Sequence, residues 1–302
     1  MSNETKQVSS SQQLGSGLRQ KLRDYQLLFK FRLSMLVVFS ACIAFLLASP
    51  QATAQQLLLL TASSCLITWA ASALNQVLEK DLDKLMSRTA NRPLAAGRME
   101  VSEAVLAAGL MSAVGLILLA SFNPVSAVLG ALSLISYAFI YTPMKRVSPA
   151  AVWVGAIPGA LPMAIGWTAA TGSLGVGAVF LFSVQFFWQF PHFWAIAWLA
   201  YEDYAKAGFY LLPTKEKDGR TRASALQALA YALVLLPISI VPVYIGLTGW
   251  VSASVMFALA AVYSWYALRL YIDCTPQAAR RLMFSSFFYL PVVLIALLLD
   301  KI

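Results

Sequence analysis

The stretch NQVLEKDLDKLMSRTANRPL, Asn75–Leu94, places several acids directly after a long and almost wholly apolar run. If the apolar helix continues into it, Asn75, Glu79 and Asp83 lie at i, i+4 and i+8 and share one helix face. Asp81 then points elsewhere. A carboxylate inside hydrocarbon costs roughly 2.5–3.5 kcal/mol on insertion scales. The acids therefore predict a wet site at a membrane surface, or a site filled by cations.

Mg²⁺ bound to a diphosphate would suit these acids, because it is typically held by one or two carboxylates together with phosphate oxygens. The alternative is a solvated loop, in which the acids pair with Lys80, Lys84 and Arg88. Spacing alone leaves both interpretations open.

The composition indicates the class of protein. The 302 residues are 60% hydrophobic and only 12% charged, and the mean hydropathy is +0.71, which is typical of a polytopic membrane protein. Apolar runs of spanning length predict nine helices, at about 27–48, 55–75, 101–121, 125–142, 149–170, 174–200, 223–247, 250–271 and 281–299. The predicted fold class is all-α, with a disordered cytoplasmic tail at 1–26 and one transmembrane domain at 27–302.

The basic residues predict the orientation. With the N-terminus inside and nine spans, only Lys301 of the 22 Lys and Arg residues falls outside. This asymmetry follows the positive-inside rule and places the N-terminus in the cytoplasm. The net charge of +9 then reflects topology and attraction to anionic lipid, and not nucleic-acid binding. We expect a multi-pass protein of the bacterial cytoplasmic (inner) membrane.

Further candidate residues lie at the predicted inner ends of other helices. Lys145 and Arg146 follow Pro143, where they could hold diphosphate oxygens or only anchor the helix at the membrane surface. The predicted sixth helix ends near Glu202 and Asp203, on the same side as Glu79 and Asp83, so the acidic ends could face each other across a cavity. The alternative is two unrelated loops with solvated charges.

The sixth predicted helix also carries the only histidine, His192, directly after a kink-forming Pro191. Eleven residues separate His192 from Asp203, which on a continuous helix brings both within about 20° of one face. A histidine inside a membrane is a functional candidate by default. The alternative is a core histidine bonded to the backbone carbonyl that Pro191 leaves free.

These motifs resemble the UbiA superfamily of intramembrane prenyltransferases and, within it, the branch that farnesylates haem. N-x3-D-x3-D matches Asn75, Glu79 and Asp83, R-T-x-x-R-P-L matches Arg88–Leu94, Y-x-x-x-K-R matches Tyr141–Arg146, W-Q-F-P-H matches Trp188–His192, and D-Y-x-x-A-G ending in L-P matches Asp203–Pro213. Two departures stand out. Glu79 replaces the usual Asp, and the second superfamily motif, D-x3-D, is represented only by Asp203 with Glu202 beside it.

The resemblance implies nine helices around a central cavity. It also implies transfer of farnesyl from farnesyl diphosphate to a vinyl group of haem b, with water addition and release of pyrophosphate. It implies catalytic roles for Asn75, Asp83, Asp203 and His192, Mg²⁺ ligation by Asn75, Glu79, Asp83 and Asp203, diphosphate binding by Arg88, Arg92, Lys145 and Arg146, and haem binding by His192 and Trp188.

Farnesyl diphosphate, haem b and membrane lipid are the implied partners, with a haem A synthase or a terminal oxidase as a further candidate and no nucleic acid. Two alternatives remain open at this point. One is a related prenyltransferase that acts on an aromatic quinone precursor, and the other is a haem or lipid transporter. Release of pyrophosphate would separate either enzyme from the transporter.

Overall fold

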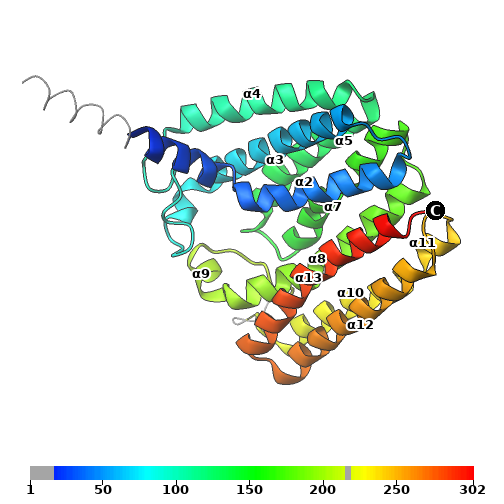
Figure 1. The fold of residues 1–302 in the computed structure, drawn as a ribbon. Coiled ribbons are helices and arrows are strands. Elements are labelled where there is room, and N and C mark those ends of the chain that lie inside the picture. Colours follow the sequence, from blue (N-terminus) through cyan, green and yellow to red (C-terminus); the bar gives the residue numbers. More distant parts are fainter. Residues whose placement is uncertain (1–16, 215–218) are drawn as a thin grey trace, which may run out of the picture.

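The computed structural model describes residues 17–214 and 219–302, and this part of the chain is almost wholly helical (Figure 1). A helix at 17–28 precedes the labelled elements. These are α2 (Phe31–Ala48), α3 (Ala54–Asp83), α4 (Val101–Ala120), α5 (Pro124–Ile135), the π-helix η1 (Ser136–Tyr141), α6 (Thr142–Met144), α7 (Ala151–Thr171), α8 (Val176–Leu199), α9 (Tyr201–Lys206), α10 (Arg222–Ile238), α11 (Val241–Tyr244), α12 (Trp250–Asp273) and α13 (Pro276–Leu299).

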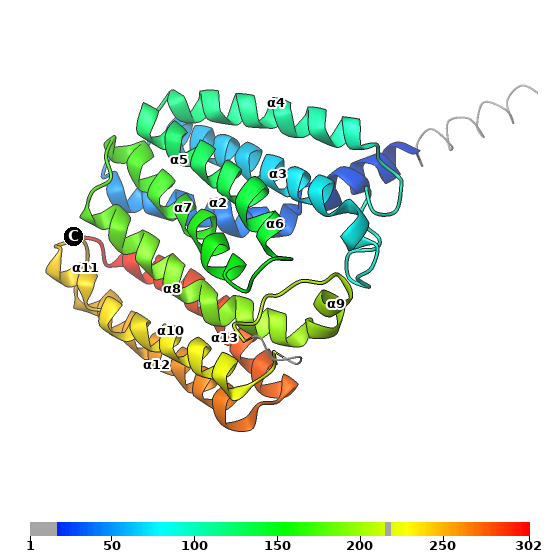
Figure 2. The same cartoon turned by 180° about the vertical axis from the view of Figure 1, so that it is seen from behind.

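The long helices form one bundle in which neighbours along the chain usually pack together. Helix α3 lies between α4 and α2, α2 packs on α7, and α7 packs on α8. Helices α8, α10, α12 and α13 form the second half of the bundle, as both views show (Figures 1 and 2). The short α9 lies at the same end of the bundle as the loop that follows α3.

Eight helical segments among the described residues are long and apolar enough to cross a membrane. The predicted span at 125–142 is one of them, built from α5, η1 and α6 (Pro124–Met144). Helix α8 has 24 residues but falls outside this set, because Gln185, Gln189 and His192 lower its hydropathy. The all-α membrane architecture is confirmed, whereas the count of about nine spans is not.

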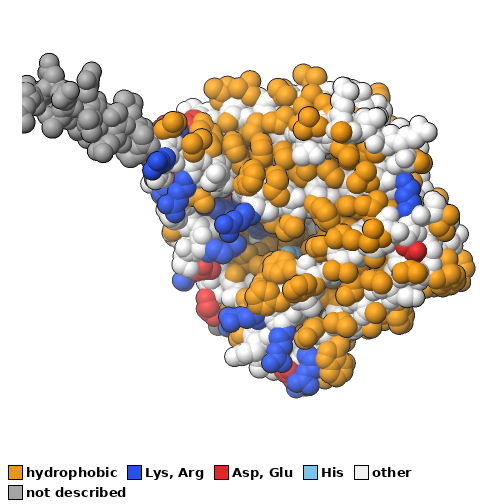
Figure 3. All heavy atoms as spheres, in the orientation of Figure 1, with side chains coloured by type: hydrophobic (Ala, Val, Ile, Leu, Met, Phe, Trp, Pro, Cys, Tyr) orange, Lys and Arg blue, Asp and Glu red, His pale blue; other side chains and the backbone are white. Residues whose placement is uncertain are grey.

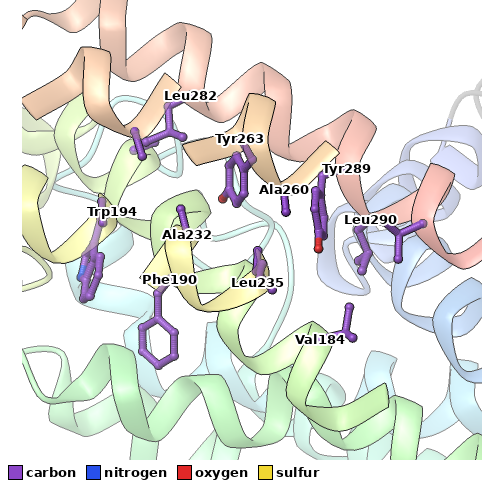
Figure 4. Close-up of a cluster of buried hydrophobic side chains, with 14 of the residues drawn as sticks. Val184, Phe190, Trp194, Ala232, Leu235, Ala260, Tyr263, Leu282, Tyr289 and Leu290 are labelled. Atoms are coloured by element: carbon purple, nitrogen blue, oxygen red, sulfur yellow. The ribbon is translucent and has the colours of Figure 1, made fainter. Parts of the chain in front are cut away.

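The core of the second half of the bundle is filled by apolar side chains that converge from four helices (Figure 4). Phe190 and Trp194 of α8 meet Leu235 of α10 and Tyr263 of α12 there, and all four are almost completely buried. In the other half, small residues bring the helices into close contact. A Cβ atom at Gly166 of α7 would lie 2.0 Å from a backbone oxygen of α2, so only glycine fits this crossing.

The sequence predicts a disordered tail over residues 1–26, of which only the last ten are among the described residues. Those ten are helical. Lys21 and Tyr25 both bond to Glu103 of α4, at 2.7 and 2.6 Å, and Asp24 pairs with Arg98 at 2.9 Å. These contacts hold a polar segment against the domain. The Ser- and Gln-rich composition of the tail does not reveal such contacts.

Figure 3 shows that hydrophobic side chains cover the middle of the molecule while Lys and Arg gather at one end. That end contains the loop after α3 and the α9 region. A membrane protein of this kind exposes an apolar belt to lipid and keeps its cations at the surface. The polar end is therefore the end of the bundle that meets water.

Candidate active site

Helix α3 supplies the acidic side of the site, because it continues without a break to Asp83. Asn75, Glu79 and Asp83 are 1%, 4% and 1% exposed, and all three line one cavity. Asp81 is exposed and pairs with Lys84 at 2.8 Å. The predicted shared face is confirmed. Among the acids of this stretch, only Asp81 makes the kind of exposed ion pair that a solvated loop would show.

The loop after α3 folds back onto the end of that helix. Thr89 donates its hydroxyl hydrogen to the backbone oxygen of Asp83, at 2.9 Å. Arg92 then reaches the Asp83 carboxylate, and its NH1 nitrogen lies 2.8 Å from Oδ1 and 2.7 Å from Oδ2. A charge-assisted contact of this kind holds both side chains firmly.

Glu79 is paired with a cation from a distant part of the chain. The Lys145 Nζ lies 2.7 Å from Glu79 Oε1, and Asn75 Nδ2 donates to Glu79 Oε2 at 2.9 Å and to Thr142 Oγ1 at 3.2 Å. Lys145 follows α6, which continues directly from the π-helix η1. Such π-turns are frequent at functional sites. The wider turn helps to bring this chain segment against α3.

Aromatic rings surround the Lys145 ammonium group. Its nitrogen lies 4.7 Å from the centre of the Tyr141 ring and 5.6 Å from that of Phe209. The backbone oxygen of Lys145 accepts a hydrogen bond from the Tyr210 N–H at 2.7 Å. The loop after α9 therefore closes over Lys145 and joins the two halves of the bundle at this point.

Lys30 is a site residue that the sequence analysis missed. It adopts a left-handed backbone conformation (φ 49°, ψ 48°) at the start of α2. Its Nζ donates to Asn75 Oδ1 at 2.7 Å and lines the same cavity. Burial, and then the charges of Arg92 and Lys145, lower the pKa of the Lys30 ammonium well below its usual value of 10.5. The only sequence signal is a lysine at the polar end of the first span, which the positive-inside rule already explains.

The cavity enclosed by these groups has a volume of about 160 Å³. Its lining consists of Lys30, Leu33, Asn75, Glu79, Asp83, Met86, Arg88, Thr89, Arg92, Tyr137, Tyr141, Lys145, Tyr204, Phe209 and Leu211. Four basic side chains thus face two carboxylates, and aromatic rings complete the walls. This balance suits an anion with several oxygens better than a neutral ligand.

Asp203 approaches the loop after α3 but does not line the cavity. Its Oδ2 accepts from the Ser87 hydroxyl at 2.7 Å and from the Arg88 N–H at 3.4 Å, and Lys206 lies 3.4 Å from Oδ1. The hydrogen bond from Ser87 holds the pKa of Asp203 below its usual 3.8. The two acidic helix ends do meet at the polar end of the bundle, through these contacts.

The predicted basic residues divide into two groups. Arg88, Arg92 and Lys145 line the cavity, and Arg88 also donates to the Tyr204 hydroxyl at 3.1 Å. Arg146 is exposed and is not among the lining residues. Consecutive residues after a helix end point in different directions, so the Lys-Arg pair places one cation inside and one outside.

His192 and Trp188 lie away from the cavity lining, within α8. Their rings stack with centroids 5.0 Å apart, and His192 Nδ1 lies 2.7 Å from the Ser286 hydroxyl of α13. Helix α8 ends at Leu199 and α9 begins after Ala200. The continuous-helix estimate that placed His192 and Asp203 on one face therefore does not apply.

No group of three or more His, Cys, Asp or Glu side chains within residues 17–214 and 219–302 is arranged to hold a metal ion. The cavity nevertheless offers oxygen donors from Glu79, Asp83 and Asn75, and oxygen is the donor that Mg²⁺ prefers. These oxygens now contact Lys145, Arg92 and Lys30. The donor set fits a Mg²⁺ ion that completes its coordination with phosphate oxygens.

Comparisons with known proteins agree with this geometry. The model of the UbiA prenyltransferase family matches residues 37–290. Curated relatives named "Protoheme IX farnesyltransferase" include those of Cytophaga hutchinsonii, 44% identical over 93% of this chain and 99% of the relative, and of Christiangramia forsetii, 42% identical over 93% and 94%. The human mitochondrial relative of that name is 36% identical over 93% of this chain and 64% of its own length.

Two solved structures share the fold at low sequence identity. One, from a study of digeranylgeranylglyceryl phosphate synthase, is 16% identical, has a TM-score of 0.78 and covers 93% of this chain and 98% of its own. The other, a UbiA homologue from Archaeoglobus fulgidus bound to GPP and Mg²⁺, is 17% identical, with a TM-score of 0.66 and coverage of 91% and 99%. The family model spans most of the chain and the curated relatives match it nearly end to end, so the chain belongs to the UbiA prenyltransferase family.

Proposed function

We propose that this prenyltransferase transfers a farnesyl group from farnesyl diphosphate to a vinyl group of haem b, with addition of water, to give haem O and pyrophosphate. The proposal that the donor is a diphosphate rests on the cavity, in which four basic side chains face Glu79 and Asp83. The proposal that haem is the acceptor rests on the relatives named "Protoheme IX farnesyltransferase". Their alignments cover 92–93% of this chain.

The polar end of the cavity is proposed to hold the diphosphate. Lys30 supports this placement, because burial and like charges lower its pKa and a bound anion would reverse the effect of those charges. Arg88, Arg92 and Lys145 would neutralise the phosphate oxygens. Mg²⁺, held by Asn75, Glu79 and Asp83, would neutralise the charge that builds on the departing pyrophosphate. Asp203 stays a candidate fourth ligand.

The proposed reaction breaks the C–O bond of farnesyl diphosphate, and the electron pair leaves on pyrophosphate. The terminal vinyl carbon of haem b forms the new C–C bond to the farnesyl carbon. Water adds to the carbocation that remains on the inner vinyl carbon and then loses a proton. Tyr137 and Tyr141 line the cavity, where their ring faces could steady the allylic cation.

Haem b is proposed to lie against the apolar body of the bundle, with His192 as its iron ligand and Trp188 beside it. His192 is 8% exposed and belongs to an aromatic group that includes Phe287, a residue exposed on α13. Neutral imidazole is a common haem ligand. We propose that the protein lies in the bacterial inner membrane with its N-terminus in the cytoplasm. Contact with a haem A synthase or a terminal oxidase stays a prediction.

The test uses the purified full chain in lipid nanodiscs with farnesyl diphosphate, haem b and Mg²⁺. We expect pyrophosphate release that requires both substrates. Products are then identified by mass spectrometry. Release with an aromatic quinone precursor but not with haem would identify the alternative prenyltransferase, and no release with either acceptor would contradict the proposal.

A further inference from the structure

The side chain of His192 is held by a serine on a neighbouring helix. Its Nδ1 atom lies 2.7 Å from the hydroxyl oxygen of Ser286, and these residues are 8% and 0% exposed. The same hydroxyl also bonds to the backbone oxygen of Met283, one turn earlier in α13. Ser286 therefore connects the only histidine of the chain to the backbone of α13.

This arrangement favours one of the two neutral tautomers of the imidazole. A serine hydroxyl has one hydrogen to donate, and the Met283 carbonyl can only accept it. When that hydrogen goes to the Met283 carbonyl, the Ser286 oxygen accepts from Nδ1, which is then the protonated nitrogen of a neutral ring. The lone pair lies on Nε2, for which no hydrogen bond occurs within the described part of the chain.

The ring plane is fixed by the same residues. The Trp188 ring stacks on it at an interplanar angle of 14°, and the indole Nε1 of Trp188 donates to the backbone oxygen of Ser286 at 3.0 Å. Tyr263 donates to the backbone oxygen of Trp188 at 3.1 Å, and the edge of Phe287 covers another side. Ser286 thus contacts both members of the His192–Trp188 stack.

We propose that Ser286 is a positioning residue that holds His192 in the tautomer whose Nε2 lone pair can ligate the haem iron. Metal-bound histidines commonly donate their second N–H to an oxygen, which fixes the tautomer and raises the basicity of the ligating nitrogen. This inference rests on the proposed function, since it requires haem as the acceptor. Figure 3 shows a hollow in the face on which α2 and α13 lie.

The test compares four variants with the parent protein. Ser286→Ala removes the hydroxyl, Ser286→Thr restores it, and His192→Ala removes the ligand. Ser285→Ala is the matched control, because the neighbouring serine makes the same kind of bond to a backbone oxygen, that of Leu282 at 2.8 Å, without the second contact to His192. Each protein is titrated with haem b, and the iron–histidine stretching band of the ferrous complex is measured by resonance Raman spectroscopy.

We expect Ser286→Ala to weaken haem binding roughly 10-fold or more, the usual effect of losing such a partner. The iron–histidine band should also move to lower frequency, because Nδ1–H no longer donates to an oxygen and the ligand becomes less basic. Ser286→Thr should restore both values, Ser285→Ala should match the parent, and His192→Ala should abolish the band.

Three results would overturn the inference: an unchanged band in Ser286→Ala, an equal change in Ser285→Ala, or a persistent band in His192→Ala. A merely structural role for Ser286 would lower the yield of folded protein without moving the band in what remains. The proposed function is tested separately, by pyrophosphate release from the parent with haem b. If the parent makes haem O while the Ser286→Ala band stays unchanged, the inference fails and the function stands.

Discussion

Removal of the cation that faces Glu79 should unfold the protein more easily and stop catalysis, and a second change should separate the two effects. Glu79 and Lys145 are 4% and 8% exposed and lie 2.7 Å apart. Lys145→Met leaves a buried carboxylate without its cation, a change that typically costs about 3–5 kcal/mol. At about 2–4 °C per kcal/mol, the thermal midpoint should fall by roughly 6–20 °C.

The double variant Lys145→Met with Glu79→Gln should recover most of that loss, because no uncompensated charge remains and Asn75 can still donate to the Gln oxygen. It should not recover pyrophosphate release, since both the cation proposed to bind phosphate and the carboxylate are gone. Arg146→Met is the stability control, because Arg146 is adjacent but exposed.

Thermal midpoints are measured on detergent-purified protein, and turnover is measured by pyrophosphate release. This expectation is refuted if Lys145→Met melts within 1–2 °C of the parent, which would mean that losing the cation costs no more than about 1 kcal/mol. It is also refuted if the double variant regains turnover.

Asp83→Asn and Asp203→Asn should each abolish pyrophosphate release while leaving folded protein in the membrane, whereas Glu79→Asp should be tolerated. Near-normal turnover of either Asn variant at saturating Mg²⁺ would remove that residue from the metal site. The Ser87 bond lowers the pKa of Asp203, so its stabilisation is fully present above pH 3.8 and is lost as the pH falls through the lowered pKa. Thermal midpoints of Ser87→Ala and the parent should therefore differ at neutral pH and converge in acid, and a constant difference would contradict this cause. Reporter fusions after residues 123, 172 and 248 should report the outside of the cell. Cytoplasmic signals at two of them would contradict the model of nine spans with a cytoplasmic N-terminus.

The acidic half of the site could be predicted because it depends on one continuous helix. Helical periodicity alone places Asn75, Glu79 and Asp83 together, and α3 runs unbroken through all three. The exposed Asp81 follows from the same geometry. Such local arguments need no knowledge of how distant segments pack.

The basic half depends on contacts between distant segments, and periodicity does not reveal them. Lys145 reaches Glu79 across 66 residues of sequence, by way of a π-helix that no composition signal marks. Lys30 enters through a left-handed backbone conformation at the start of α2. The break at Ala200 separates His192 from Asp203, and a continuous-helix extrapolation cannot anticipate it.

The most direct test of the central claim is mass spectrometry of haem after incubation with the purified protein, farnesyl diphosphate and Mg²⁺. We predict a haem product heavier than haem b by one farnesyl group plus one hydroxyl group, formed together with one pyrophosphate per product. Unchanged haem in the presence of a protein that prenylates an aromatic quinone precursor would contradict it.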